Sequence, residues 1–211
     1  EEEESMWENG LNQMYSAWTE GRKLIKWMKH YNKQHEHKLH YYGLDIGGFY
    51  QNWQRPIEPI LSYLQKVDPA YATSYSQQLK PYMEFMSTNA RINYSQHMKR
   101  EQQIQLALLL EKGVEQFNIC QKMYISKSSQ DEYAWMKQSL ISMQLAEHYY
   151  QNLLQLSRDA ANNDDNEDEE DYSSTCVGLN GREIAMFRNL LWVIRQRQRL
   201  QKEEGSTTST D

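Results

Sequence analysis

The sequence contains few of the residues that interrupt helices or cross-link small folds. Its 211 residues include 9 Gly, 4 Pro and 2 Cys. So few turn-forming residues argue against an all-β fold. The two cysteines, Cys120 and Cys176, are consistent with a reducing compartment and need not pair. No apolar run approaches the roughly 20 residues of a membrane span, and no signal-peptide pattern opens the chain. These absences predict a cytoplasmic protein.

Apolar residues make up 39% of the chain, and its mean hydropathy is −0.92. This balance suits long amphipathic helices, each of which buries only one stripe of its surface. The 15 Tyr and 6 Trp residues argue that the chain as a whole is not disordered. We therefore predict an all-α fold.

Charge is distributed unevenly along the chain. The formal net charge is −6, yet residues 22–137 carry 16 Lys/Arg against 10 Asp/Glu. The acidic residues gather at the N-terminus and at 164–171. We expect disordered ends at 1–5 and 204–211, a disordered acidic insert at about 161–178, and one helical domain over 6–203. A pI near 5.6 argues against a nucleic-acid partner.

Apolar spacing and start signals place the helices. A first helix is expected over 6–18, and a second pattern begins after Gly21. Asp68 and Pro69 together form a helix-start signal. A run from Tyr71 to Ile125 would span roughly 80 Å if it stayed helical throughout. Further helices are expected over 131–159 and 182–202.

Motifs of catalytic or metal-binding chemistry are hard to find in this sequence. It has no Gly-rich phosphate loop, no G-x-S-x-G and no H-E-x-x-H. Nothing marks Cys120 as an activated thiolate. Four histidines lie close together, but no Cys or paired carboxylate completes a tetrahedral site with His30, His35, His37 and His40. The sequence therefore predicts no catalytic residue, no metal and no cofactor.

Two terminal stretches and one internal element carry distinctive sequence motifs. Near the start, W-E-N-G at residues 7–10 is followed by G-R-K-L at 21–24. Near the end, R-N-L-L-W-V occupies 188–193, and an A-E-x-x-Y element stands at 146–150. These elements are similar to the opening, closing and returning-helix segments of the F-BAR family.

The resemblance implies an elongated bundle of long antiparallel helices that forms a homodimer. It implies a scaffold or adaptor, peripheral at the membrane or cytoskeleton, that binds anionic phospholipid surfaces. Such a scaffold would link membrane shape to actin or endocytic proteins. A second hypothesis is a helical dimerisation and protein-interaction module that has lost membrane binding.

Basic and apolar residues supply the candidate sites for these two hypotheses. Lys and Arg side chains near an anionic leaflet each contribute about 1 kcal/mol, although a row of them is also what a solvated helix face carries. The lipid-binding candidates are Arg22, Lys23, Lys26, Lys29, Lys33, Lys66, Lys80, Arg91, Lys99 and Arg100. The dimer or core candidates are Trp7, Leu11, Trp18, Leu24, Met28, Phe187, Leu191 and Trp192.

Overall fold

The structure is a computed structural model, and it describes residues 19–43, 54–85, 94, 97–162 and 172–207. Every regular element in these ranges is a helix, which confirms the all-α prediction. The chain divides into two compact units, Glu1–Gly43 and Leu44–Asp211.

The first unit contains helix α3, Thr19–Gln34, which has no buried residue. The chain that follows α3 folds back on the helix end. Asn32 donates through its amide to the Leu39 carbonyl at 2.8 Å and accepts from the Leu39 N–H at 2.7 Å. Lys38 donates to the carbonyls of Asn32 and His35. These contacts satisfy carbonyls that the end of a helix leaves without a partner.

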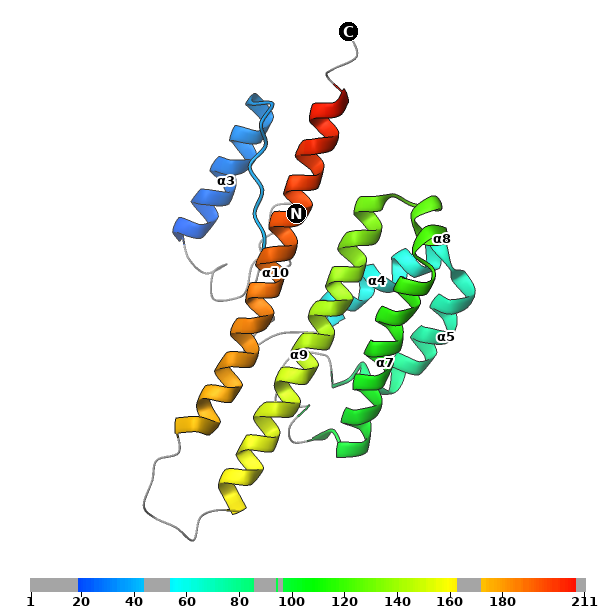
Figure 1. The fold of residues 1–211 in the computed structure, drawn as a ribbon, viewed down its shortest axis with the longest axis vertical. Helices are drawn as coiled ribbons and strands as arrows, with labels where there is room; N and C mark the ends of the chain where they lie inside the picture. The colour runs from blue at the N-terminus through cyan, green and yellow to red at the C-terminus, as the bar shows by residue number, and fades with distance from the viewer. Residues whose placement is uncertain (1–18, 44–53, 86–93, 95–96, 163–171, 208–211) are drawn as a thin grey trace. The chain divides into compact units, whose positions relative to one another are not determined.

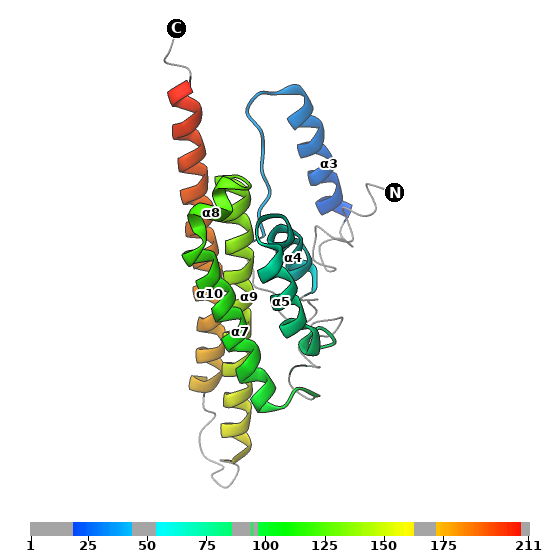
Figure 2. The same cartoon turned by 90° about the vertical axis from the view of Figure 1, so that its right-hand side faces the viewer.

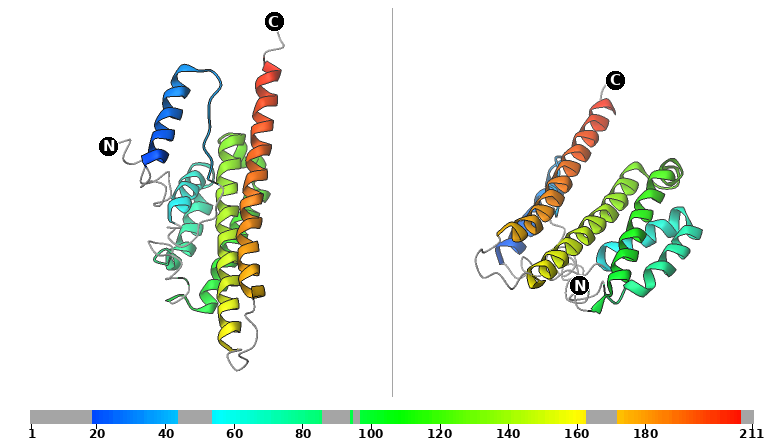
Figure 3. Two further views of the ribbon diagram at one scale, coloured as in Figure 1. Left: turned by 90° about the vertical axis from the view of Figure 1, so that its left-hand side faces the viewer. Right: turned by 60° about the horizontal axis from the view of Figure 1, so that its bottom comes forward.

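The second unit consists of six α-helices and one 3₁₀ turn among its described residues. They are α4 Gln54–Val67, α5 Pro69–Leu79, η1 Lys80–Tyr82, α7 Arg100–Ile119, α8 Gln121–Ser126, α9 Gln130–Asn162 and α10 Tyr172–Thr207. Helix α9 packs against α4, α7 and α10. It runs antiparallel to α10 and separates it from the group formed by α4, α5 and α7 (Figures 1 and 3). Figure 2 shows α4 and α5 beside one another, on one side of α9 and α10.

The core of the second unit forms where α4, α5, α7 and α9 meet. Each helix contributes apolar residues three or four positions apart, the spacing that places them on one face. Fully burying a Leu, Ile or Phe side chain stabilises a fold by about 1.5–3 kcal/mol. The largest fully buried apolar and aromatic side chains are Ile57, Ile60, Leu64, Tyr75, Leu79, Leu106, Leu110, Phe117, Tyr124 and Leu140.

The helix-start signal at Asp68 and Pro69 is confirmed. The Asp68 carboxylate accepts from the Tyr71 N–H at 3.2 Å and caps α5, while Pro69 occupies the first turn. The other oxygen of Asp68 accepts from the Tyr124 hydroxyl at 3.1 Å. One carboxylate therefore caps α5 and ties it to α8.

The stretch from Tyr71 to Ile125 does not stay helical throughout. Helix α5 ends at Leu79, a 3₁₀ turn covers Lys80–Tyr82, and α7 begins only at Arg100. Pro81 lies in that turn, where its missing N–H and its ring oppose a continuing α-helix. Lys99, which precedes α7, is extended with φ −67° and ψ 153°. The chain therefore reverses, and α5 and α7 pack together instead of forming a single rod.

The two longest helices extend beyond their predicted ends. Helix α9 reaches Asn162 and α10 begins at Tyr172, so both edges of the predicted disordered insert, 161–178, are helical. Helix α10 also continues to Thr207, into the predicted tail. Adding one residue to an existing helix costs far less than starting one. Residues 1–5, 163–171 and 208–211 lie outside the described residues.

Candidate functional site

Helix α9 carries a carboxylate on its apolar face. Glu147 follows Leu140 and Met143 by seven and four residues and precedes Tyr150 by three, so the four side chains share one side of the helix. All four are buried, and Glu147 is 0% exposed. Glutamate is almost never fully buried without a charged partner. A carboxylate in this position is therefore a candidate for chemistry.

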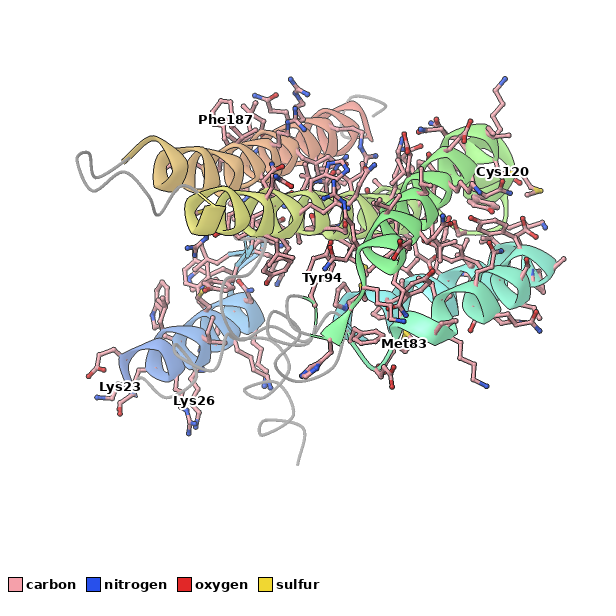
Figure 4. All side chains as sticks on the ribbon, turned by 90° about the horizontal axis from the view of Figure 1, so that it is seen from below. Lys23, Lys26, Met83, Tyr94, Cys120 and Phe187 are labelled. Atoms are coloured by element: carbon pink, nitrogen blue, oxygen red, sulfur yellow. The ribbon has the colours of Figure 1, made fainter. Side chains whose placement is uncertain are left out.

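The two oxygens of Glu147 have different surroundings. Oε1 accepts from the Tyr94 hydroxyl at 2.7 Å and from the Gln151 amide at 2.6 Å. Oε2 is buried and has no hydrogen-bond partner among the residues that the structure describes. Figure 4 shows Tyr94 beside α9. One oxygen is thus held in place, and the other keeps its lone pairs unused.

Tyr94 is positioned by α7 and α9. The buried amide of Gln103 on α7 donates to the Tyr94 carbonyl at 2.9 Å and to the Met98 carbonyl at 3.2 Å. The Tyr94 ring lies 5.8 Å from that of Tyr150, centroid to centroid. The hydroxyl is therefore directed at Glu147 by contacts to two helices.

Burial raises the pKa of Glu147 from 4.5 to about 7. Removing the carboxylate from water disfavours its charged form, and this effect outweighs the hydrogen bonds from Tyr94 and Gln151, which lower the pKa. Near neutral pH the group is present in both protonation states. A carboxyl group tuned in this way can accept a proton and return it within one reaction.

A second, partly buried polar cluster has a structural role. The hydroxyl of Tyr124 donates to Asp68, and the side chain of Tyr71 lies beside the same carboxylate. Burial raises the pKa of Tyr71 to about 12. Burial also raises the pKa of Tyr124 above its ordinary value. Both phenols therefore stay protonated at neutral pH. Since Asp68 caps α5, this cluster is accounted for by the fold.

The predicted lipid-binding residues within the described ranges lie on the surface. Lys23 and Lys26 project outward from α3 (Figure 4). Lys66 on α4 forms an ion pair with Glu132, with 2.7 Å between Nζ and Oε2. The other exposed members of the set are Arg22, Lys29, Lys33, Lys80, Lys99 and Arg100. Arg91 lies outside the described residues.

The predicted dimer or core residues divide between surface and interior. Leu24 on α3 and Phe187 on α10 are 50% and 59% exposed, so neither belongs to the core of its own unit. Met28 and Leu191 are half-buried. Trp192 is also half-buried and packs edge-on against Trp135 of α9, with 4.7 Å between ring centroids. Three members, Trp7, Leu11 and Trp18, lie outside the described residues.

Sequence reasoning did not identify Glu147 as a site. It treated A-E-x-x-Y at 146–150 only as part of a family resemblance. The usable signal was the position of the carboxylate in the apolar row of α9. Tyr94 carried no comparable signal, because 53 residues separate it from Glu147.

Comparison with known families identifies the chain. A family model described as erythromycin esterase matches residues 1–204. The chain belongs to the erythromycin esterase family. No curated protein matches it. No solved structure matches it either.

Family membership overturns the resemblance to F-BAR proteins and the scaffold function drawn from it. The alternative of a helical interaction module is not supported either. Within the segment R-N-L-L-W-V, Asn189 and Trp192 pack against α9 of the same chain. Asn189 accepts from Gln138 at 2.8 Å, and Trp192 packs against Trp135, so both residues join α10 to α9.

The prediction that the chain is not an enzyme is also wrong, because the family is named for an esterase. The motif search recognises only residues that stand close together in sequence. It could not detect a pair such as Tyr94 and Glu147. The membrane and endocytosis predictions lose their support with the resemblance. Among the described helices, none combines the length with the apolar run that a membrane span requires.

Proposed function

We propose that this chain is a hydrolase of carboxylic esters in which Glu147 transfers the proton. Two observations support the proposal. The chain belongs to a family named for an esterase. It also holds a buried carboxyl group whose pKa is near 7 and whose Oε2 atom is unpartnered among the described residues. The second observation carries the residue assignment.

Glu147 acts as a general base toward water in the proposed reaction. Oε2 takes a proton from a water molecule while the water oxygen forms a bond to the ester carbonyl carbon. The tetrahedral intermediate then collapses, the bond between the carbonyl carbon and the alcohol oxygen breaks, and Glu147 returns the proton to that oxygen. The products are one carboxylic acid and one alcohol, and no further reactant is needed.

Tyr94 and Gln151 prepare Glu147 for this step as positioning residues. Both donate to Oε1, at 2.7 and 2.6 Å, so the orientation of the carboxyl group is set and Oε2 is the atom left to accept the proton. Both donors also stabilise the charged form, which keeps the pKa near neutrality and not higher.

Burial of the carboxyl group has two consequences for the reaction. Desolvation makes Glu147 a stronger base than an exposed glutamate, because its charged form is less stable. Full burial also means that water and the ester reach Oε2 only when neighbouring side chains move apart. We therefore expect hydrolysis to be slower than with an exposed carboxyl group of the same pKa.

The test uses the full chain with activated aryl esters and with erythromycin, the compound in the family name. We expect the wild type to hydrolyse these esters, at a rate that rises with pH through about 7 as Glu147 ionises. An aryl ester gives an alcohol and an acid, whereas a cyclic ester opens to a single hydroxy acid. Glu147→Gln should lower kcat by about 10²–10⁴-fold, the usual contribution of a general base. Tyr94→Phe should move the midpoint of the pH–rate profile to higher pH, because the substitution removes a hydrogen-bond donor that lowers the pKa of Glu147.

Glu111→Gln is the matched control, since Glu111 is an exposed glutamate on α7. It should hydrolyse esters at the wild-type rate. If the wild type hydrolyses none of these esters, the proposed activity is wrong. If Glu147→Gln remains folded and fully active, the activity stands but the residue assignment is wrong.

A further inference from the structure

Helix α10 presents a second apolar stripe on the side opposite its packed face. The packed face includes Ala185 and Asn189, both buried. The second stripe consists of Ile184, Phe187, Leu191 and Ile194, at intervals of three, four and three residues. This spacing fills the a and d positions of a heptad, with Ile184 at a. Figure 4 shows Phe187 on the side of α10 away from α9.

The exposure of this stripe is high for residues of its type. Ile184 is 53% exposed, Phe187 59% and Ile194 44%. A continuous apolar row on a helix that already packs through its other side indicates an interaction surface. Residues 184–194 extend for about 15 Å, so the surface is small.

Two charges beside the stripe identify the partner. With Ile184 at a, Glu183 is at the g position of the preceding heptad and Arg188 is at the e position of the heptad that Ile184 begins, and both side chains are exposed. No ion pair is recorded for either residue within the described part of the chain. In a parallel pair of helices, a g residue faces the e residue of the following heptad on the other helix. Glu183 of one copy would therefore face Arg188 of a second copy.

We propose that the stripe Ile184, Phe187, Leu191 and Ile194 is the seam of a parallel homodimer of α10. Two-fold symmetry repeats the contact between Glu183 and Arg188 on the other edge of the seam. An antiparallel pair matches e with e and g with g, which would place Arg188 opposite Arg188 of the second copy. The charges therefore favour the parallel arrangement.

The dimer follows from α10 alone and does not depend on the proposed esterase activity. Since α9 already holds α10 in helical form, association orders little additional backbone. The short seam nevertheless implies weak association. The measurement is therefore light scattering of the full chain, supported by sedimentation equilibrium, from about 1 μM to about 1 mM.

The charge pairs give the decisive variants. We expect Glu183→Arg and Arg188→Glu each to weaken the dimer about tenfold, because each replaces two attractive contacts by two repulsive ones. The double variant with both changes should recover the wild-type dissociation constant. This recovery cannot arise within one helix, because residues five apart do not face each other.

Phe187→Ser tests the apolar part of the seam. The variant should remain monomeric at every concentration, with little change in unfolding, because Phe187 is mostly exposed. A wild type that is monomeric at 1 mM would overturn the proposal. A double charge variant that fails to recover would overturn the parallel pairing. A monomeric wild type that Phe187→Ser strongly destabilises would show that another part of the same chain covers the stripe.

Discussion

The stability of the Glu147→Gln variant relative to the wild type should be higher at alkaline pH than at acidic pH. A buried carboxyl group whose pKa rises from 4.5 to about 7 binds its proton more tightly in the folded than in the unfolded state. A difference of one unit in pKa corresponds to about 1.36 kcal/mol, so the free energy of unfolding changes by about 3 kcal/mol over the full titration. Because Glu147 is 0% exposed, screening by solvent does not reduce this figure.

The sign of the effect follows from linkage between protonation and folding. Below about pH 4.5 the group is protonated in both states, and the wild type keeps its full stability. Between about pH 4.5 and pH 7 the unfolded chain loses this proton while the folded protein retains it, so the free energy of unfolding falls. Above about pH 7 the loss is complete. About 2.5 kcal/mol of this loss in the free energy of unfolding occurs between pH 5 and pH 8.

Glutamine fits the site without changing the hydrogen bonds to Oε1. Its carbonyl oxygen can accept from Tyr94 and Gln151, and its amide nitrogen then takes the place of Oε2. The unpaired amide has a cost that does not vary with pH. The informative quantity is therefore the difference between wild type and variant, compared at the two pH values.

Urea unfolding at pH 5 and pH 8 measures this quantity. The stability of Glu147→Gln relative to wild type should rise by about 2.5 kcal/mol from pH 5 to pH 8. Glu111→Gln, the exposed control, should show a much smaller change over the same range. Equal stability differences at the two pH values would refute the assignment of a raised pKa to Glu147.

Two further substitutions test the packing of the second unit. Gly113→Ala should lower the free energy of unfolding by about 1–2 kcal/mol, because its Cβ would lie 2.5 Å from the Tyr75 hydroxyl and 2.9 Å from Leu140 Cδ2. Thermal unfolding checks this, and Gly43→Ala, whose Cβ would meet nothing within 4 Å, is the control. Asn189→Leu should cost about 1–3 kcal/mol in urea unfolding, since Gln138 and Ser142 both donate to Asn189, at 2.8 and 3.1 Å.

Local signals in the sequence predicted several helix positions well. The start of α5 was predictable because Asp68 and Pro69 act through their own backbone surroundings. Helix α9 was expected over 131–159 and runs over Gln130–Asn162. The break between α5 and α7 was not predicted, because the apolar spacing from Tyr71 to Ile125 continues past Pro81. Spacing alone does not distinguish one long helix from two that pack together.

The candidate site and the family were less accessible from the sequence. Glu147 meets Tyr94 only because α7 and α9 pack together, and 53 residues separate the two. The basic and aromatic residues that suggested an F-BAR domain are common to many amphipathic helices. Arg188, Asn189 and Trp192 lie within one short segment yet face different surroundings. Only the fold shows that Asn189 and Trp192 serve the contact with α9.

The central position of α9 has a consequence for synthesis of the chain. The Tyr63 hydroxyl of α4 contacts the Ser128 hydroxyl 65 residues later, and Lys66 pairs with Glu132, 66 residues away. At about 5–20 residues per second, synthesis of α4 is complete roughly 3 to 13 s before the first residue of α9 is added. During that interval α9 cannot yet cover the apolar face of Ile57, Ile60 and Leu64. A nascent chain stalled before Gln130 should therefore bind chaperones that recognise exposed apolar segments more strongly than the completed protein does.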